Sequence, residues 1–103
     1  MTRVSLPGRR QHEVIEFRHG HVDYRGSVSF DRVTGLPIEV FLCGGKVGSE
    51  VESGARDCAV IVSLAVQHGV PLETLRRALT RLDDGKAAGP MGRLLDLVAA
   101  AAP

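Results

Sequence analysis

Residues 22–30 read Val-Asp-Tyr-Arg-Gly-Ser-Val-Ser-Phe, and this stretch decides the fold. Apolar side chains alternate with polar ones, at Val22, Tyr24, Val28 and Phe30. Because successive side chains of a β-strand point to opposite faces, the alternation predicts a strand with one buried face. Gly26 falls on the buried side, which predicts either a bulge or the close approach of a neighbouring element at that point.

Shorter stretches on both sides predict two further strands of the same sheet. Residues 13–18 come before the central stretch, and His19-Gly20 between them is typical of a tight hairpin turn. Residues 37–43 follow the polar turn at residues 31–35 and repeat the alternation of apolar side chains. Because all the connections are short, we expect an antiparallel three-stranded meander.

The pattern changes to helical spacing after the third predicted strand. Ser49 and Glu52 form an S-x-x-E capping box, in which each side chain satisfies a backbone N–H at a helix start. The helix predicted over residues 49–68 is apolar nearly all round and should therefore be largely buried. Amphipathic stretches that begin at Pro71 and Pro90 predict further helices. The expected fold class is α+β, a three-stranded antiparallel meander followed by two or three helices packed on one face.

Three polarizable or polar side chains sit in apolar surroundings. Ser63 lies in the middle of the apolar helix, where its hydroxyl is expected to bond to the preceding turn. Cys43 and Cys58 belong to no C-x-x-C pair and are expected to behave as small hydrophobic residues. Without a secretion signal, a disulfide between them is not expected.

Composition limits the classes of function. A chain of 103 residues with 44% hydrophobic residues fits one domain, predicted over residues 12–103 after a flexible N-terminal arm at residues 1–11. A net charge of +1 and an aromatic content of 4% are unfavourable for binding nucleic acid. No segment approaches the roughly 20 apolar residues of a membrane span. We therefore expect a cytoplasmic protein with no membrane partner and no cofactor.

The glycine-rich stretch over residues 44–49 is the candidate binding site. Its site residues are Gly45, Lys46, Gly48 and Ser49. Backbone N–H groups of such a loop, at the start of a helix, can bind an anion such as a nucleotide phosphate. The stretch is not a P-loop, because Ser or Thr does not directly follow Gly-Lys, and the acidic Glu50 and Glu52 would repel an anion. A connection that simply needs glycine is the alternative interpretation.

No catalytic or metal site is predicted. His19, His21 and Asp23 have the alternation of a strand-borne metal site, but a solvated hairpin face explains them equally well. Asp83-Asp84 is typical of a turn rather than of a pair of catalytic carboxylates.

Two surface features concern partners. The predicted helix over residues 49–68 has more apolar surface than one small sheet can cover, so we expect a homodimer. Arg76, Arg77 and Arg81 lie close together in the sequence, which indicates either solvated surface or contacts with nucleic acid.

Four stretches carry a family resemblance, which covers about residues 21–98. They are Gly-Leu-Pro-Ile-Glu-Val-Phe-Leu at 35–42, Gly-Lys-Val-Gly-Ser at 45–49, Ser-Leu-Ala-Val-Gln-His-Gly-Val-Pro-Leu-Glu at 63–73 and Ala-Gly-Pro at 88–90. In these stretches the chain resembles the TSCPD domain family and is similar to the C-terminal region of cobalamin-dependent (class II) ribonucleotide reductases. The Thr-Ser-Cys-Pro-Asp motif that names the family is missing.

The resemblance implies a link to deoxyribonucleotide synthesis without the reductase's own catalytic body. The leading hypothesis is a stand-alone, non-catalytic domain that binds a nucleotide or other anion, a partner protein or itself. One alternative is a small subunit that completes a ribonucleotide reductase encoded elsewhere. The other alternative is a nucleic-acid-associated regulator that uses the arginine cluster.

Overall fold

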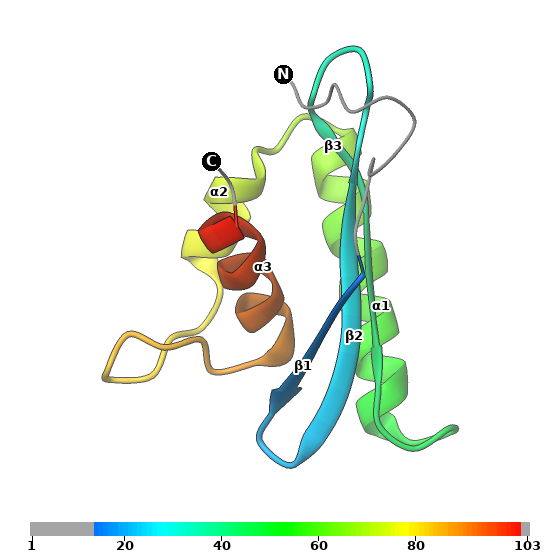
Figure 1. The fold of residues 1–103 in the computed structure, drawn as a ribbon, viewed down its shortest axis with the longest axis vertical. Helices are drawn as coiled ribbons and strands as arrows, with labels where there is room; N and C mark the ends of the chain where they lie inside the picture. The colour runs from blue at the N-terminus through cyan, green and yellow to red at the C-terminus, as the bar shows by residue number, and fades with distance from the viewer. Residues whose placement is uncertain (1–13, 102–103) are drawn as a thin grey trace.

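A computed structural model describes residues 14–101, so the predicted arm at residues 1–11 lies outside the described residues. The elements of the described part are, in order, β1 (Ile15–His19), β2 (Val22–Phe30), β3 (Pro37–Gly44), α1 (Glu50–Gln67), α2 (Leu72–Ala78) and α3 (Pro90–Ala101). The strands form one antiparallel sheet in the order β1-β2-β3 (Figure 1). The predicted α+β fold, a meander followed by helices, is confirmed.

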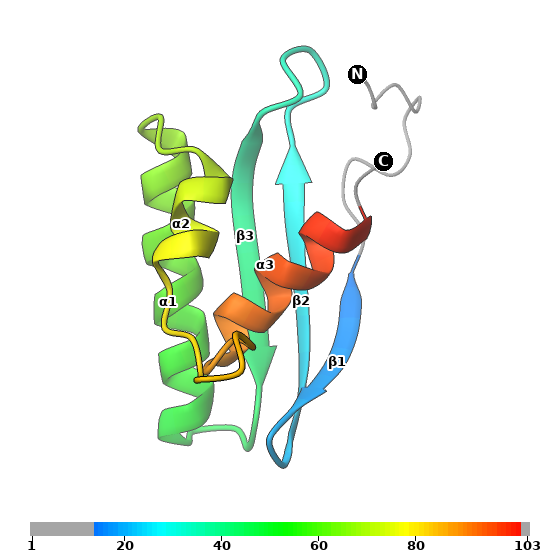
Figure 2. The same ribbon diagram turned by 90° about the vertical axis from the view of Figure 1, so that its left-hand side faces the viewer.

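Helices α1 and α3 cover different parts of the sheet. Figure 2 shows α1 running alongside β3, whereas α3 crosses in front of the strands. Side chains from β2, β3, α1 and α3 form a single core cluster. Leu42 of β3 and Leu94 and Leu95 of α3 are its largest fully buried side chains. The core is therefore aliphatic, and α3 supplies its centre.

Gly26 marks the point where α3 comes closest to the sheet. A Cβ atom added to Gly26 would lie 2.7 Å from Cδ2 of Leu94. The register between β2 and β3 is regular at this point and shifts only between Ser29 and Phe30. Of the two predicted reasons for this glycine, the close approach is therefore the one that the structure confirms.

The first hairpin turn lies one residue later than predicted. His19 is the last residue of β1 and pairs with Val22, which leaves Gly20-His21 as the turn. Gly20 has a φ of 63°, a left-handed conformation that glycine adopts without strain. The prediction of a turn at His19-Gly20 is therefore wrong by one position.

The prediction for Ser63 is wrong in a way that explains how α1 is held. The Ser63 hydroxyl accepts a hydrogen bond from the Val40 N–H at 2.8 Å and donates one to the Val40 carbonyl at 3.0 Å. One turn further along α1, Gln67 Nε2 donates to the Ile38 carbonyl at 2.7 Å. Because β3 is an edge strand, its outward backbone groups have no strand partner, and α1 satisfies them instead.

Candidate binding surface

The glycine-rich loop brings all its predicted site residues together between β3 and α1. Gly45 and Gly48 have φ values of 82° and 84°, so both positions require the left-handed conformation that glycine provides. One half of the predicted capping box is confirmed, because the Ser49 hydroxyl accepts a hydrogen bond from the Glu52 N–H at 3.2 Å. The Glu52 carboxylate accepts from the Gly48 N–H instead of the Ser49 N–H. Lys46 is exposed. The geometry of the loop thus accounts for its glycines without any ligand.

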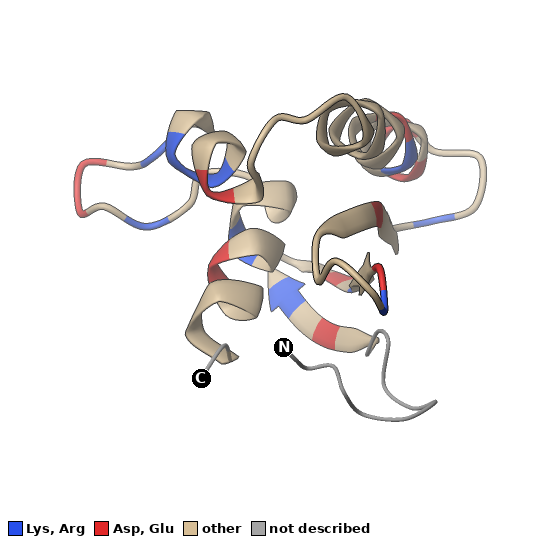
Figure 3. Ribbon diagram, turned by 90° about the horizontal axis from the view of Figure 1, so that it is seen from above, with Lys and Arg blue, Asp and Glu red and all other residues tan. Residues whose placement is uncertain are grey.

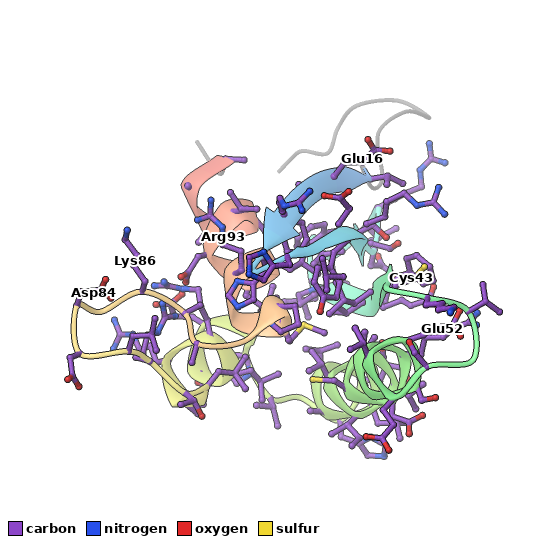
Figure 4. The ribbon with its side chains drawn as sticks, turned by 90° about the horizontal axis from the view of Figure 1, so that it is seen from below. Glu16, Cys43, Glu52, Asp84, Lys86 and Arg93 are labelled. Carbon is purple, nitrogen blue, oxygen red and sulfur yellow. The ribbon has the colours of Figure 1, made fainter. Side chains whose placement is uncertain are left out.

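Two of the backbone groups that would bind an anion are already engaged within the loop. The Gly48 N–H donates to Oε1 of Glu52 at 2.8 Å, and the Ser49 N–H donates to the Lys46 carbonyl at 3.0 Å. In Figure 4, Glu52 lies at the start of α1, beside the loop. An incoming anion would have to displace this carboxylate, so anion binding at the loop stays a prediction.

The predicted arginine cluster is part of an ion-pair network that joins α2 to α3. Arg76 contacts Glu73 at 2.7 Å and Asp96 at 3.0 Å, and Arg81 contacts Asp96 at 2.6 Å. Figure 3 shows the acidic and basic segments of these helices next to one another. Hydrogen bonds from Arg81 and Arg76 lower the pKa of Asp96 to about 2, and those from Arg76 and Arg77 lower the pKa of Glu73 to about 2. The arginines are therefore largely neutralised by partners inside the domain.

The histidines and aspartate of the first hairpin are not arranged as a metal site. His19 Nε2 lies 3.0 Å from the Ala88 carbonyl, which ties the end of β1 to the loop before α3. Asp23 accepts a hydrogen bond from Arg18 at 3.0 Å on the exposed face. Within residues 14–101, no three His, Cys, Asp or Glu side chains gather closely enough to hold a metal ion.

A shallow, mostly apolar cleft separates the first half of α1 from the start of α3. Its volume is about 390 Å³, and Cys58, Thr80 and Met91 are among the residues that line it. Burial raises the pKa of the Cys58 thiol, which disfavours the reactive thiolate. Both cysteines are free.

The outer side of α1 carries apolar side chains where a solvated helix would carry charges. Val60, Ile61 and Leu64 are 56%, 65% and 51% exposed. All charged residues of α1 lie in its first half, and none occurs between Cys58 and Gln67. A helix exposed on one side normally places polar residues there, so this face is typical of a helix that packs against something further.

The apolar face continues onto β3 across a groove. The groove has a volume of about 310 Å³, and its lining includes Phe41 and Leu42 of β3 and Val60 and Leu64 of α1. Phe41 is 39% exposed, and two further exposed apolar residues, Leu36 and Ile38, come shortly before it in the chain. We call the apolar area formed by Phe41 of β3 and by Val60, Ile61 and Leu64 of α1 the α1–β3 surface.

The sequence predicts excess apolar surface on the helix but does not locate this surface. The residues of α1 on their own do not show which side faces the core, because the helix is apolar nearly all round. Ser63 and Gln67 were the available signal, because polar side chains beside a buried stripe mark where a helix meets backbone groups.

Comparison with known proteins identifies the family. The model of the TSCPD domain family matches residues 3–101, nearly the whole chain. No match was found among curated proteins or among solved structures. Across residues 14–101, no helix is both long and apolar enough to cross a membrane. The chain belongs to the TSCPD domain family, which is known from class II ribonucleotide reductases, and it is a small domain related to those enzymes.

Proposed function

We propose that this TSCPD domain is a non-catalytic binding domain and that the α1–β3 surface is where it binds another protein. The observation that carries the proposal is the uncharged second half of α1, whose exposed positions are Val60, Ile61 and Leu64. Exposed apolar groups of this size typically mark protein interaction sites, because burial of apolar area drives protein association.

The titratable groups of the domain support a structural rather than a catalytic role for its charges. Among the carboxyl groups of the described residues, the largest pKa shifts belong to Glu73 and Asp96, whose pKa values are lowered by their arginine partners. Catalytic acids and bases are usually shifted toward neutral pH, whereas these two carboxyl groups are shifted away from it. Their network fastens α2 to α3 and thereby supports the core against which α1 packs.

The family supports one class of partner in particular. Because TSCPD domains are known from class II ribonucleotide reductases, a large reductase subunit is the natural candidate for a heterologous partner. The second candidate is another copy of this chain, which carries the same α1–β3 surface. Nucleic acid is less favoured, because Arg76 and Arg81 are paired with carboxylates. Cytoplasmic location stays a prediction, which fluorescent tagging in the native cell checks.

Affinity capture from native cells tests this proposal. The full chain serves as bait in three forms, the wild type, Leu64→Glu and Leu82→Glu. Leu64 and Leu82 are 51% and 53% exposed, so they are matched in exposure, but Leu82 lies outside the α1–β3 surface. We expect the wild type and Leu82→Glu to capture an identified reductase subunit or the untagged chain itself, and Leu64→Glu to lose it. Capture that is equal with all three baits would overturn the proposal.

A further inference from the structure

We propose that the cleft between α1 and α3 binds a small molecule that has a carboxylate group and an apolar body. This site is separate from the α1–β3 surface, because none of the residues that form that surface lines the cleft. The proposal rests on three hydrogen-bond donors at the cleft, which are the hydroxyl of Tyr24 and two backbone N–H groups at the start of α3.

Tyr24 is a buried residue whose side chain extends toward the cleft. Its ring stacks on Phe17 on one side, with the ring centroids 5.7 Å apart, and on the other side it occupies the space that a Cβ atom of Gly44 would need. Gly44 belongs to β3, and α1 runs along the far side of β3 (Figure 2). The ring therefore leans from β2 across β3 toward α1, so that its hydroxyl end reaches the cleft that Tyr24 lines.

The hydroxyl of Tyr24 has no partner in the part of the chain that the structure describes. The residue is only 7% exposed, and no hydrogen bond among residues 14–101 engages this hydroxyl. Because buried tyrosine hydroxyl groups usually have a hydrogen-bond partner, a ligand in the cleft would supply the one that is missing here.

The start of α3 adds backbone donors to the same cleft. The first hydrogen bond of this 12-residue helix runs from the Arg93 N–H to the Gly89 carbonyl at 3.1 Å, so the N–H groups of Met91 and Gly92 precede it. Among the described residues neither N–H has an acceptor, although both residues are buried and both line the cleft. Unlike α1, α3 has no acidic residue in its first turn, so the partial positive charge of its N-terminus is not balanced.

The donors and the lining together indicate the class of ligand. Three donors require a group with several acceptor sites, which a carboxylate provides and a helix N-terminus favours. Glu50 is the one charged residue among the described residues that line the cleft, so no cation balances a dianion such as a phosphate. The remaining lining is mostly apolar and includes Val51, Ala55 and Leu79. Because a volume of about 390 Å³ is typical of small-molecule sites, an apolar body of a few carbon atoms fits beside the carboxylate.

Titration of the full chain with hexanoate, followed by backbone ¹H–¹⁵N chemical shifts, tests the proposal. Saturable changes should be largest at Gly89, Met91 and Gly92, with a dissociation constant on the order of 1 mM for a ligand of this size. Hexanamide has the same apolar body without the charge and should bind about tenfold more weakly. Absence of a saturable change at these residues, or equal affinity for the two probes, would overturn the proposal.

Two substitutions test the contributions of individual groups. Tyr24→Phe removes only the hydroxyl and should weaken hexanoate binding about fivefold, while the Tm stays within about 2 °C of the wild type. Glu50→Gln removes the negative charge from the lining and should strengthen binding about twofold, whereas Glu16→Gln, at an exposed position outside the cleft, should leave it unchanged. If Tyr24→Phe binds hexanoate as well as the wild type, or if its Tm falls by more than about 5 °C, the hydroxyl serves the fold and the proposal is wrong.

Discussion

The hydroxyl of Ser63 allows a direct test of how α1 is fastened to the sheet. In Ser63→Ala, the Val40 N–H loses its acceptor, and Val40 is only 4% exposed, so water cannot readily replace it. A buried donor left without a partner costs about 1–3 kcal/mol. Alanine is the better helix former by roughly 0.5 kcal/mol, which offsets part of this loss. We therefore expect the free energy of unfolding to fall by about 1–2 kcal/mol.

Urea unfolding followed by circular dichroism measures this change. The matched control is Ser53→Ala, the same substitution on the same helix at an exposed position, whose hydroxyl bonds only to the Ser49 carbonyl. The control should change stability by no more than about 0.5 kcal/mol. In thermal unfolding, Ser63→Ala should lower Tm by about 5–15 °C. If the two variants are equally stable, the side chain of Ser63 does not fasten α1 to β3, and the reasoning is refuted.

Three other perturbations test separate parts of the structure. Gly26→Ala should lower the free energy of unfolding by about 1–3 kcal/mol, because the new methyl group meets the fully buried Leu94. If urea unfolding shows this variant to be as stable as the wild type, α3 can move away from the sheet. In the folded chain, the pKa values of Asp96 and Glu73 are lowered to about 2, from 3.8 and 4.5. The stability that these ionised carboxylates contribute is therefore present above about pH 4.5 and is lost as the pH falls toward 2. Asp96→Asn should make the loss of Tm with falling pH shallower, and an unchanged pH profile would count against the network. If the loop binds nucleotide phosphate, Lys46→Ala should weaken the binding free energy of nucleoside di- and triphosphates, measured by calorimetry, by about 1.5–3 kcal/mol. If the wild type does not bind them at millimolar concentration, the loop is only a connection between β3 and α1.

Local patterns allowed the fold to be predicted from the sequence. The alternation over residues 22–30 and the capping box of Ser49 and Glu52 each involve neighbours within a few residues, so their geometry is implied by chain spacing. The same alternation predicts that Gly26 lies on the buried side, and the structure shows that the reason is the close approach of Leu94 rather than a bulge. These features are local, and the sequence specifies them directly.

The candidate surface depends on contacts that sequence spacing does not reveal. Ser63 reaches Val40 across 23 residues, and Arg81 reaches Asp96 across 15. Without the docked positions of α1 and α3, a lone serine suggests a bond within its own helix, and clustered arginines suggest free positive charge. The excess apolar surface was predictable from the composition of α1, but its extension onto Phe41 requires the register of β3 beside the helix.

Backbone ¹H–¹⁵N chemical shifts of the full chain test most directly whether the α1–β3 surface binds another protein. The shifts are compared on dilution and on addition of a captured reductase subunit. The largest shift changes should cluster at residues 39–41 and 56–64, on the α1–β3 surface. Changes confined to the loop at residues 44–49 or to α2 and α3, with none on the α1–β3 surface, would contradict it.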